Sequence, residues 1–159
     1  MTGAQLERFW ADARGFITSL PEEVPGAWSF GATAEHADEL LELVLAGEKT
    51  GTASALWDLE AEGEPVPEVG EFSVIIDGLG RPRAVIVTTA VDIVPFAEVG
   101  AEHARSEGEG DRMLAAWREI HERFWRRLGS SDRGFSREMP VVCERFRVVF
   151  SGRGPTPTG

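Results

Sequence analysis

Two apolar runs in the middle of the chain place the strongest constraint on its fold. They read FSVIID at 72–77 and AVIVTTAVDIV at 84–94, and a short turn at 78–80 lies between them. Apolar, β-branched runs on either side of a glycine-containing turn predict two antiparallel strands. We therefore predict a hairpin with strands over 72–77 and 83–94.

Other segments have apolar residues at helical spacing, and each has an end signal of its own. Thr33 and Asp111 stand where an N-cap is expected, and Gly47 stands where a helix should stop. The predicted helices span 4–19, 33–46 and 111–128, with a short helix or turn over 100–110. The remaining predicted strands span 53–57 and 139–150. The acidic, proline-containing segment 58–70 is predicted to be a loop with one helical turn.

Length and composition exclude several classes of protein. The 159 residues, 17.4 kDa, correspond to one ordinary domain. No apolar run approaches the roughly 18 residues of a membrane span, and the first residues do not read as a secretory signal. The single cysteine, Cys143, excludes an intrachain disulfide framework and a cysteine-rich zinc site. We expect a cytoplasmic protein with no membrane or disulfide partner, and the oligomeric state stays open.

Charge is distributed unevenly along the chain. The net charge is -11, which argues against non-specific binding of long nucleic acid. Residues 1–117 carry 7 basic and 22 acidic side chains, whereas residues 118–159 carry 9 basic and 5 acidic ones. The C-terminal quarter is therefore either a local anion-attracting face or a mixed, solvated surface.

Lys49 is the first candidate functional residue. It is the only lysine among 16 basic side chains, and a lysine, unlike arginine, can lose its proton when it is desolvated. Thr52 follows three residues later, and Gly51 lets the backbone bend between them. An amine and a hydroxyl this close can act as a base and the nucleophile that it activates, or can bind a carbonyl oxygen or a phosphate. The alternative is a polar loop whose lysine favours the helix dipole.

An acidic segment at 107–111, EGEGD, is the second candidate. His103 precedes it and His121 follows it. A carboxylate near a lysine serves as a general acid or base if their environments separate their pKa values. The alternative is a solvated turn in which Asp111 caps the next helix. A metal held by His103, Glu107 and His121 is conceivable, but the spacing does not support it, so we predict no metal.

Trp117 and His121 lie one helical turn apart, so they share a face of the predicted helix over 111–128. We expect Trp117 to be buried in the core. We expect His121 to lie at the core edge.

Taken together, these segments resemble an ASCH domain, a family of the PUA-like superfamily. The resemblance spans roughly 28–150 and leaves 1–27 as an N-terminal helical extension and 151–159 as a disordered tail. It is carried by Phe30-Gly31, ADEL at 37–40, GEKTGT at 47–52, PEVGE at 67–71, PFAEV at 95–99, EGEGD at 107–111, Trp117-Arg118 with His121, and VCERF at 142–146.

The resemblance implies a fold and a site. The fold is α+β, a PUA-like mixed β-barrel flanked by helices, here with an additional N-terminal helix. The implied catalytic group is Lys49, Thr52 and Glu107, with Glu109 as the alternative to Glu107. Thr50, Glu109, His121 and Trp28 are the expected substrate-binding residues, and no cofactor is implied.

The resemblance also implies a link to RNA. Some members of the family are similar to RNA-binding modules, some are reported to cleave RNA, and small members remove the acyl group from acylated cytidine. We expect hydrolysis of an amide on an acylated cytidine-type nucleoside, because the net charge favours a nucleoside or short RNA over a long one. The alternatives are a non-catalytic module that binds RNA or a modified base, and a ribonuclease that uses the same cleft.

Overall fold

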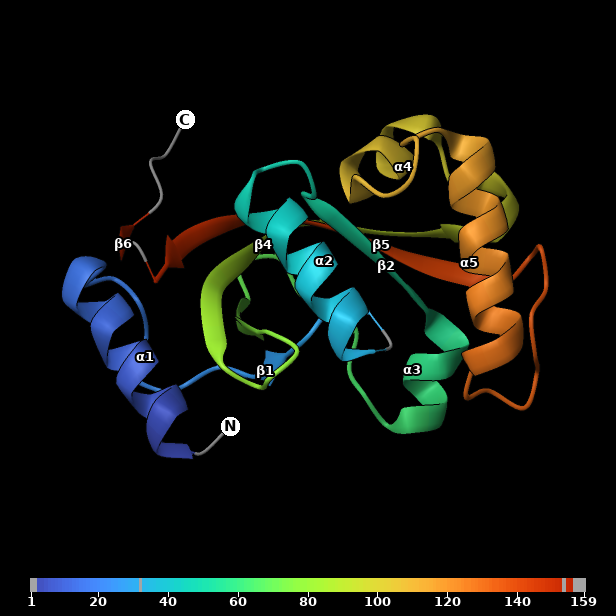
Figure 1. Ribbon diagram of the computed structural model, residues 1–159. Coiled ribbons are helices and arrows are strands. Elements are labelled where there is room, and N and C mark those ends of the chain that lie inside the picture. The colour runs from blue at the N-terminus through green and yellow to red at the C-terminus, as the bar shows by residue number, and fades with distance from the viewer. Residues whose placement is uncertain (1–2, 32, 153, 156–159) are drawn as a thin grey trace. The chain divides into compact units, whose positions relative to one another are not determined.

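The computed structural model describes residues 3–31, 33–152 and 154–155 (Figure 1). Within these ranges the sheet has the strand order β1-β3-β4-β5-β2, and β6 pairs with the end of β5. Because β1 is parallel to β3 and the other assigned pairs are antiparallel, the sheet is mixed, and the predicted α+β class is confirmed. The strands are β1 (Ala27–Trp28), β2 (Gly51–Ala55), β3 (Phe72–Ile76), β4 (Pro82–Pro95), β5 (Pro140–Ser151) and β6 (Gly154–Pro155).

The helices lie close to their predicted positions, and one helix, over 56–62, lies where a loop with a single helical turn was predicted. They are α1 (Gly3–Phe16), α2 (Ala34–Leu45), α3 (Leu56–Glu62), α4 (Ala101–Glu107) and α5 (Leu114–Leu128), with a 3-10 turn, η1 (Phe96–Glu98). None of the helices in the described ranges combines the length and the apolar character that a membrane crossing requires.

The predicted hairpin is confirmed. Strands β3 and β4 pair antiparallel, with Phe72 opposite Val87 and Ile75 opposite Ala84. Asp77 closes the turn, because its carboxylate accepts from the Arg81 Nε at 2.9 Å and from two backbone N–H groups of the turn. Burial alone would raise the pKa of Asp77, but these bonds outweigh it and lower that pKa.

The chain divides into two compact units, and both β4 and β5 contribute to each. The first unit comprises 1–47, 70–87 and 147–159. Helix α1, predicted as an N-terminal extension, contributes Trp10 and Ala13 to its core, and the Phe9 ring meets the Phe150 ring edge-on at 5.4 Å. The buried members of this core are all apolar: Trp10, Ala13, Leu20, Val74, Val85, Val149 and Phe150.

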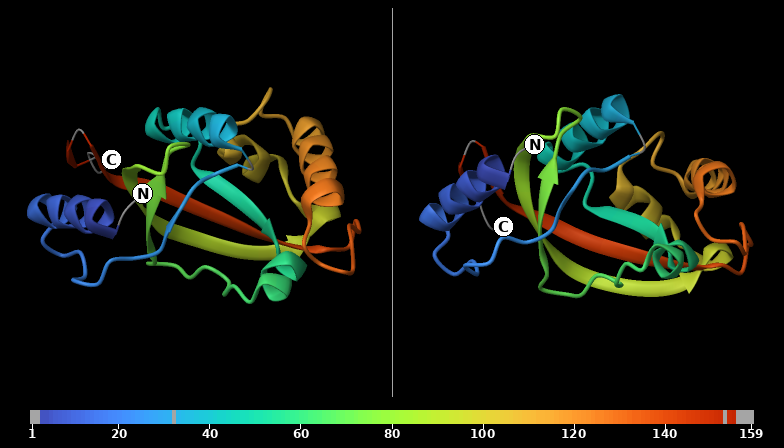
Figure 2. Two further views of the ribbon diagram at one scale, coloured as in Figure 1. Left: turned by 60° about the horizontal axis from the view of Figure 1, so that its bottom comes forward. Right: turned by 90° about the horizontal axis from the view of Figure 1, so that it is seen from below.

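The second unit comprises 48–69 and 88–146. Strand β2 pairs antiparallel with the longer strand β5, and both strands can be followed in Figure 2. Trp117 is buried as predicted, at 4% exposure, and stacks on Phe96 at 5.6 Å. The buried members of its core are Ala55, Phe96, Val99, Ala104, Trp117, Trp125, Met139, Val141 and Cys143.

Two predicted boundaries in the second unit are wrong. The predicted strand over 53–57 ends at Ala55, and the chain continues directly into α3, which is longer than the single turn expected. Asp58 of α3 accepts from the backbone N–H groups of residues 130 and 131, a long-range tie that the local sequence does not show. Helix α5 begins after Met113, and Asp111 instead accepts from the Met113 N–H at 2.8 Å, within a turn.

The predicted disordered tail over 151–159 is described only in part. Ser151 is the last residue of β5, and β6 pairs back onto it. Residue 153 and residues 156–159 lie outside the described residues.

Candidate functional site

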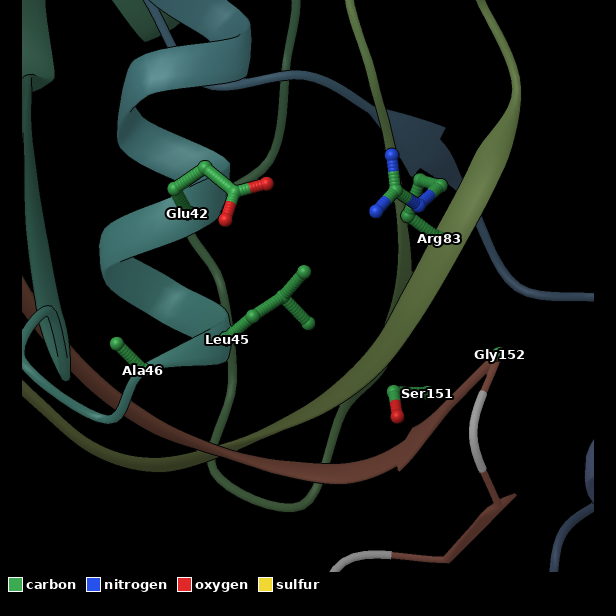
Figure 3. Close-up of a pocket in the computed structure, with 6 residues that line it drawn as sticks. All are labelled: Glu42, Leu45, Ala46, Arg83, Ser151 and Gly152. Carbon is green, nitrogen blue, oxygen red and sulfur yellow. The ribbon is translucent and has the colours of Figure 1, made fainter.

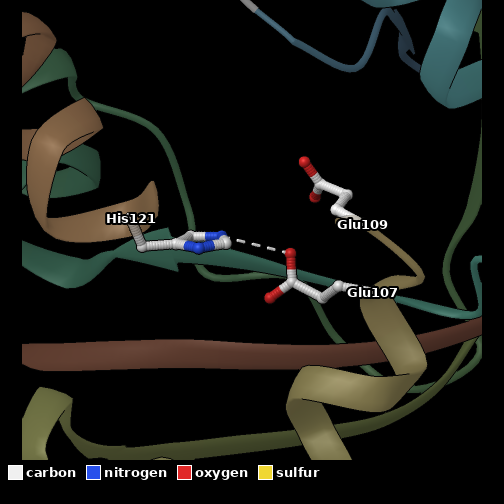
Figure 4. Close-up of side chains that lie close together, drawn as sticks. All are labelled: Glu107, Glu109 and His121. Atoms are coloured by element: carbon white, nitrogen blue, oxygen red, sulfur yellow. Dashed lines mark hydrogen bonds and ion pairs between the residues drawn. The ribbon is translucent and has the colours of Figure 1, made fainter. Parts of the chain in front are cut away.

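The carboxylate of Glu107, at the C-terminal end of α4, is the centre of a buried polar cluster. The residue is 2% exposed. Its Oε2 accepts from the Trp117 Nε1 at 2.6 Å and from the His103 Nε2 at 2.8 Å. Its Oε1 accepts from the His121 Nε2 at 3.2 Å, the bond drawn in Figure 4. We call Lys49, His103, Glu107, Glu109, Trp117 and His121 the Glu107 cluster.

Lys49 is buried in this cluster. Its side chain leads from the turn before β2, and the residue is 2% exposed. The ammonium Nζ lies 2.9 Å from the Gly51 carbonyl oxygen and 3.3 Å from that of Glu107. It also lies 3.4 Å from the Glu109 Oε2 and 3.7 Å from the Glu107 Oε1. The structure thus brings Lys49 together with both carboxylates that the sequence nominated.

The hydrogen bonds fix the protonation of His121. Its Nδ1 lies 2.9 Å from the Trp117 carbonyl oxygen, which can only accept. If Glu107 is ionised, the Nε2 has to donate as well, so the ring is an imidazolium. Burial alone would lower the pKa of His121, but the hydrogen bond and charge of Glu107 outweigh burial and raise it.

Glu107 itself is held in the ionised form. Burial by itself would raise the pKa of this carboxyl. The hydrogen bonds from His103 and His121, together with the charges of His121 and Lys49, instead lower its pKa well below the usual range. The cluster is therefore an ion network enclosed by protein rather than a solvated acidic turn.

Glycines allow the segments that carry the cluster to approach closely. A Cβ atom on Gly51 would collide with the Ser106 Oγ of α4. Gly108 has a φ of 70°, and a Cβ there would lie 2.6 Å from the Glu48 carbonyl oxygen. A hydrogen bond joins the two segments, because the Thr50 N–H donates to the Ser106 carbonyl oxygen at 2.6 Å. Close packing of α4 on the start of β2 thus places Lys49 beside Glu107 and Glu109.

Thr52 lies near the cluster but makes no hydrogen bond with it among the described residues. Successive side chains of a strand point to opposite faces. Because Ser106 of α4 lies on the face of Gly51, the Thr52 side chain points to the other face of β2. There Thr52 stands opposite Glu144, which is 7% exposed and accepts from the Thr88 hydroxyl at 2.7 Å.

The other nominated residues fall in different places. His121 belongs to the cluster, whereas Thr50 contributes its backbone to the β2–α4 contact and is exposed. Trp28 lies in β1 of the first unit, where its ring meets the Phe30 ring edge-on at 4.8 Å. The substrate-binding roles of Thr50 and Trp28 stay predictions.

Sequence reasoning treated Trp117 as a core residue and missed its contact with Glu107. The indole N–H donates to the carboxylate while the ring packs in the core and stacks on His121 at a centroid distance of 4.2 Å. The one available signal was the spacing of four residues between Trp117 and His121 and between His103 and Glu107.

The ligand atoms of Glu107, Glu109 and His121 lie within 4.8 Å of one another, a spacing that a metal ion can bridge. However, the Lys49 ammonium already lies within 3.7 Å of both carboxylates. The Glu107 oxygens also accept hydrogen bonds from His103, Trp117 and His121. The donor set therefore fits an ammonium ion better than a metal ion.

A separate hollow of about 300 Å³ lies in the first unit (Figure 3). Its lining comes from α2, from Arg83 of β4 and from the end of β5. The two charged side chains are Glu42 and Arg83, and Arg83 is already paired with Asp77 at 3.4 Å. With no buried titratable group of its own, this hollow is a weaker candidate than the Glu107 cluster.

Comparison with known proteins adds a family and several similar structures. A family model described as ASCH domain matches residues 26–150. The protein EF3133 from Enterococcus faecalis V583 is 33% identical, with a TM-score of 0.84 over 93% of this chain and 90% of its own. An ASCH domain from Lactobacillus crispatus JV V101 is 30% identical, with a TM-score of 0.75 over 89% and 94%.

A third structure, the hypothetical protein PH0355, is 14% identical, with a TM-score of 0.51 over 77% of this chain and 99% of its own, so it shows the fold alone. No curated protein matches the chain. These likenesses agree with the PUA-like architecture expected from the sequence.

Proposed function

Because the chain belongs to the ASCH domain family, which is linked to RNA binding, we propose that it hydrolyses the amide bond of an acylated cytidine-type nucleoside. The observation that carries the proposal is the position of Lys49. A buried lysine lies between two carboxylates, three residues before a threonine on an edge strand. A base and a proton-carrying carboxylate, acting on a water molecule and on the departing nitrogen, are the groups that amide hydrolysis requires.

The proposed reaction begins with a proton transfer from the Lys49 ammonium to a carboxylate of the 107–109 segment. Lys49, now the amine, takes a proton from water while the water oxygen attacks the acyl carbon. The carboxylate gives its proton to the departing nitrogen as the carbon–nitrogen bond breaks, which releases the acid and the nucleoside amine and restores both groups.

The charge of the site favours a small, uncharged substrate. The Glu109 side chain is 18% exposed and lies next to Lys49, and the whole protein carries a net charge of -11. Within the cluster Lys49 and His121 offset the two carboxylates, so a phosphate finds no excess of positive charge there, whereas an acylated nucleoside needs none. Electrostatics thus supports a nucleoside substrate over a long RNA.

The test replaces the lysine by arginine. Lys49→Arg keeps the positive charge, but a guanidinium does not give up its proton near neutral pH. We expect turnover of acylated cytidine to fall by roughly 100- to 10,000-fold, as is typical when a general base is lost, while nucleoside binding measured by calorimetry survives. Arg105→Lys, the reverse exchange at an exposed position on α4, is the matched control and should leave turnover unchanged.

Two outcomes would contradict the proposal at different levels. If the wild type turns over no member of a panel of acylated nucleosides yet binds nucleoside or RNA, the protein is a binding module. Equal turnover in wild type and Lys49→Arg would leave the hydrolase standing and remove Lys49 as its base.

One observation favours a ribonuclease as the second candidate. The exposed side of α5 carries a shallow hollow lined by two arginines and three apolar side chains: Ile120, Arg123, Phe124, Arg127 and Leu128. Arginines beside an exposed aromatic ring suit a nucleotide chain, since they contact phosphates while a base stacks. Cleavage of short RNA that weakens steeply with salt would support this candidate.

A further inference from the structure

Helix α5 has a second apolar face, beside the face that packs in the core. Ile120, Phe124 and Leu128 recur at every fourth position and line an open hollow of about 360 Å³, whose lining comes from α5 alone. Phe124 is 39% exposed and Leu128 is 59% exposed. We propose that this face binds a second copy of the chain in a two-fold symmetric dimer, in which the two α5 helices run antiparallel.

The apolar part of this face fits another helix better than it fits RNA, the competing occupant. Nucleotide chains bind on aromatic rings, onto which their bases stack, but Phe124 is the only aromatic side chain in the hollow. Branched aliphatic side chains such as Ile120 and Leu128 offer no such platform. Side chains four positions apart instead form the ridge that packs into the groove of a neighbouring helix.

The sequence of α5 is complementary to itself in the antiparallel direction. In a two-fold pair centred on Ile120, a residue four positions after the centre faces the residue four positions before it in the other copy. Phe124 then packs on Ala116 of the second copy, so a large side chain meets a small one. Seven positions from the centre, Met113, which is 63% exposed, lies along the aliphatic stem of Arg127.

Opposite charges lie at the two ends of the face. Asp111 is exposed in the turn before α5, and Arg127 is exposed in its last turn. In the part of the chain that the structure describes, neither side chain is in an ion pair, whereas the other two arginines of this half of α5 pair within the helix. Antiparallel helices bring each Asp111 to the Arg127 of the other copy. Because the exposed Arg112 offsets part of the charge, these pairs set direction more than strength.

The dimer also reaches the Glu107 cluster. A Cβ atom on Gly110 would lie 3.6 Å from the Ile120 Cδ1, so the turn before α5 lies against the apolar face. The same turn carries Glu109, whose side chain is 18% exposed. Arg127 of the second copy is therefore placed beside the turn through which the cluster meets solvent.

The size of the face sets the expected strength of the dimer. The 15 residues of α5 extend over about 22 Å, and the turn before the helix adds little to this length. One helix and a turn from each copy form an interface at the small end of the range for specific contacts, so we expect a dissociation constant on the order of 10 μM. The chain is then monomeric when dilute and dimeric when concentrated.

Sedimentation equilibrium of the full chain, from about 1 to about 500 μM, tests the proposal. We expect a monomer–dimer equilibrium in the wild type. Phe124→Glu should raise the dissociation constant at least about 100-fold, because it places a charge at the centre of the contact in both copies. Ala115→Glu, at an exposed position on another side of α5, is the matched control and should leave the equilibrium unchanged.

Two further variants test the direction of the helices. Asp111→Arg and Arg127→Asp should each weaken the dimer about fivefold or more, and the double variant should recover most of the loss. Ile120→Cys, which lies on the two-fold axis, should form a disulfide between copies on oxidation, whereas Ala115→Cys should not. The native Cys143 is buried and does not compete.

Three results would overturn the dimer. A wild type that is still monomeric at the highest concentration excludes it. A dimer that is insensitive to Phe124→Glu uses a different surface. A monomer whose binding of short single-stranded RNA, measured by fluorescence anisotropy, is lost in Phe124→Glu assigns the face to RNA instead. None of these measurements uses turnover, so a failure of the proposed hydrolysis is distinguished from a failure of the dimer.

Discussion

Each unit of the molecule contains a buried tryptophan whose indole N–H donates a hydrogen bond, but the acceptors differ. Trp10 in the first unit is 2% exposed and donates to the Pro21 carbonyl oxygen at 3.0 Å. Trp117 in the second unit is 4% exposed and donates to the ionised Glu107 carboxylate at 2.6 Å. The buried members of the core around Trp10 are apolar and its indole meets a neutral carbonyl, whereas the indole of Trp117 meets an ion network.

The difference indicates where the chain keeps its chemistry. Burying a charge is unfavourable unless it is paired and hydrogen-bonded, and strongly shifted pKa values are concentrated at functional sites. In the second unit the mutual contact of Glu107 and His121 lowers the pKa of Glu107 and raises the pKa of His121. In the first unit the core around Trp10 is formed by aromatic and aliphatic packing, and the paired carboxylate of Asp77 lies in the β3–β4 turn.

Replacing each tryptophan by alanine should show the largest difference between the units. Emptying a large aromatic site costs about 3–5 kcal/mol, and we expect this for Trp10→Ala. Trp117→Ala should lower the free energy of unfolding by about 1–3 kcal/mol more than this, because a buried charged acceptor loses its donor. Urea denaturation of the two variants measures the difference.

Trp10→Phe and Trp117→Phe serve as a matched control, since both keep a ring and remove only the N–H and part of the volume. If Trp117→Ala and Trp10→Ala lose equal free energy of unfolding, the indole bond to Glu107 contributes no more than the bond of Trp10 to the Pro21 carbonyl. The contrast between the two cores would then be one of composition alone.

The elements that the sequence predicted well are those fixed by local pattern. The hairpin of β3 and β4 follows from two apolar runs and a turn, and Thr33 caps α2 as expected, accepting from the His36 N–H at 3.1 Å. Helix α3 was underestimated because its segment is acidic and near prolines. Its ties to residues 130 and 131 come from a part of the chain that is some 70 positions away.

The site was predictable in its members more than in its geometry. Lys49 is conspicuous as the only lysine, and the family resemblance nominated both Glu107 and Glu109. The direction of Thr52 was missed because the strand was predicted to begin at 53, which left Thr52 in a turn. Since β2 begins at Gly51, the alternation of the strand separates the faces of Gly51 and Thr52.

The opposite pKa shifts in the second unit predict a pH dependence that the first unit does not share. His121 has a raised pKa, so its contribution to stability is complete below its usual pKa of 6.5 and is lost as the pH rises through the folded-state value. Glu107 has a lowered pKa, so its contribution is present above 4.5 and is lost as the pH falls. Stability from this pair is therefore greatest between the two usual values.

In the first unit, Asp77 has a lowered pKa and loses its contribution only as the pH falls below its usual value of 3.8. We expect the free energy of unfolding to decrease above pH 6.5 with a slope of at most about 1.4 kcal/mol per pH unit, the limit for one proton. His121→Gln should abolish this slope. Hydrogen exchange at the two indole N–H groups, corrected for intrinsic rates, reports on each unit, and an equal pH dependence at Trp10 and Trp117 would argue against His121 as the source.

The smallest expected effect concerns the surface of α5, where the ion pairs are exposed rather than enclosed. Arg123 pairs with Glu119 at 3.0 Å, with side chains 60% and 72% exposed. Solvent screens such a pair, so Arg123→Ala should change the free energy of unfolding by about 0.5 kcal/mol or less. Turnover of an uncharged acylated cytidine should also stay within about twofold of wild type, since this substrate offers no phosphate for the arginine to contact. If the protein instead acts on RNA through this surface, the variant should bind short RNA more weakly and lower the magnitude of the salt slope by about 0.7, the value for one single-strand phosphate contact. If RNA binding weakens in this way while stability is unchanged, the exposed charges on α5, rather than the enclosed Glu107 cluster, contact the substrate.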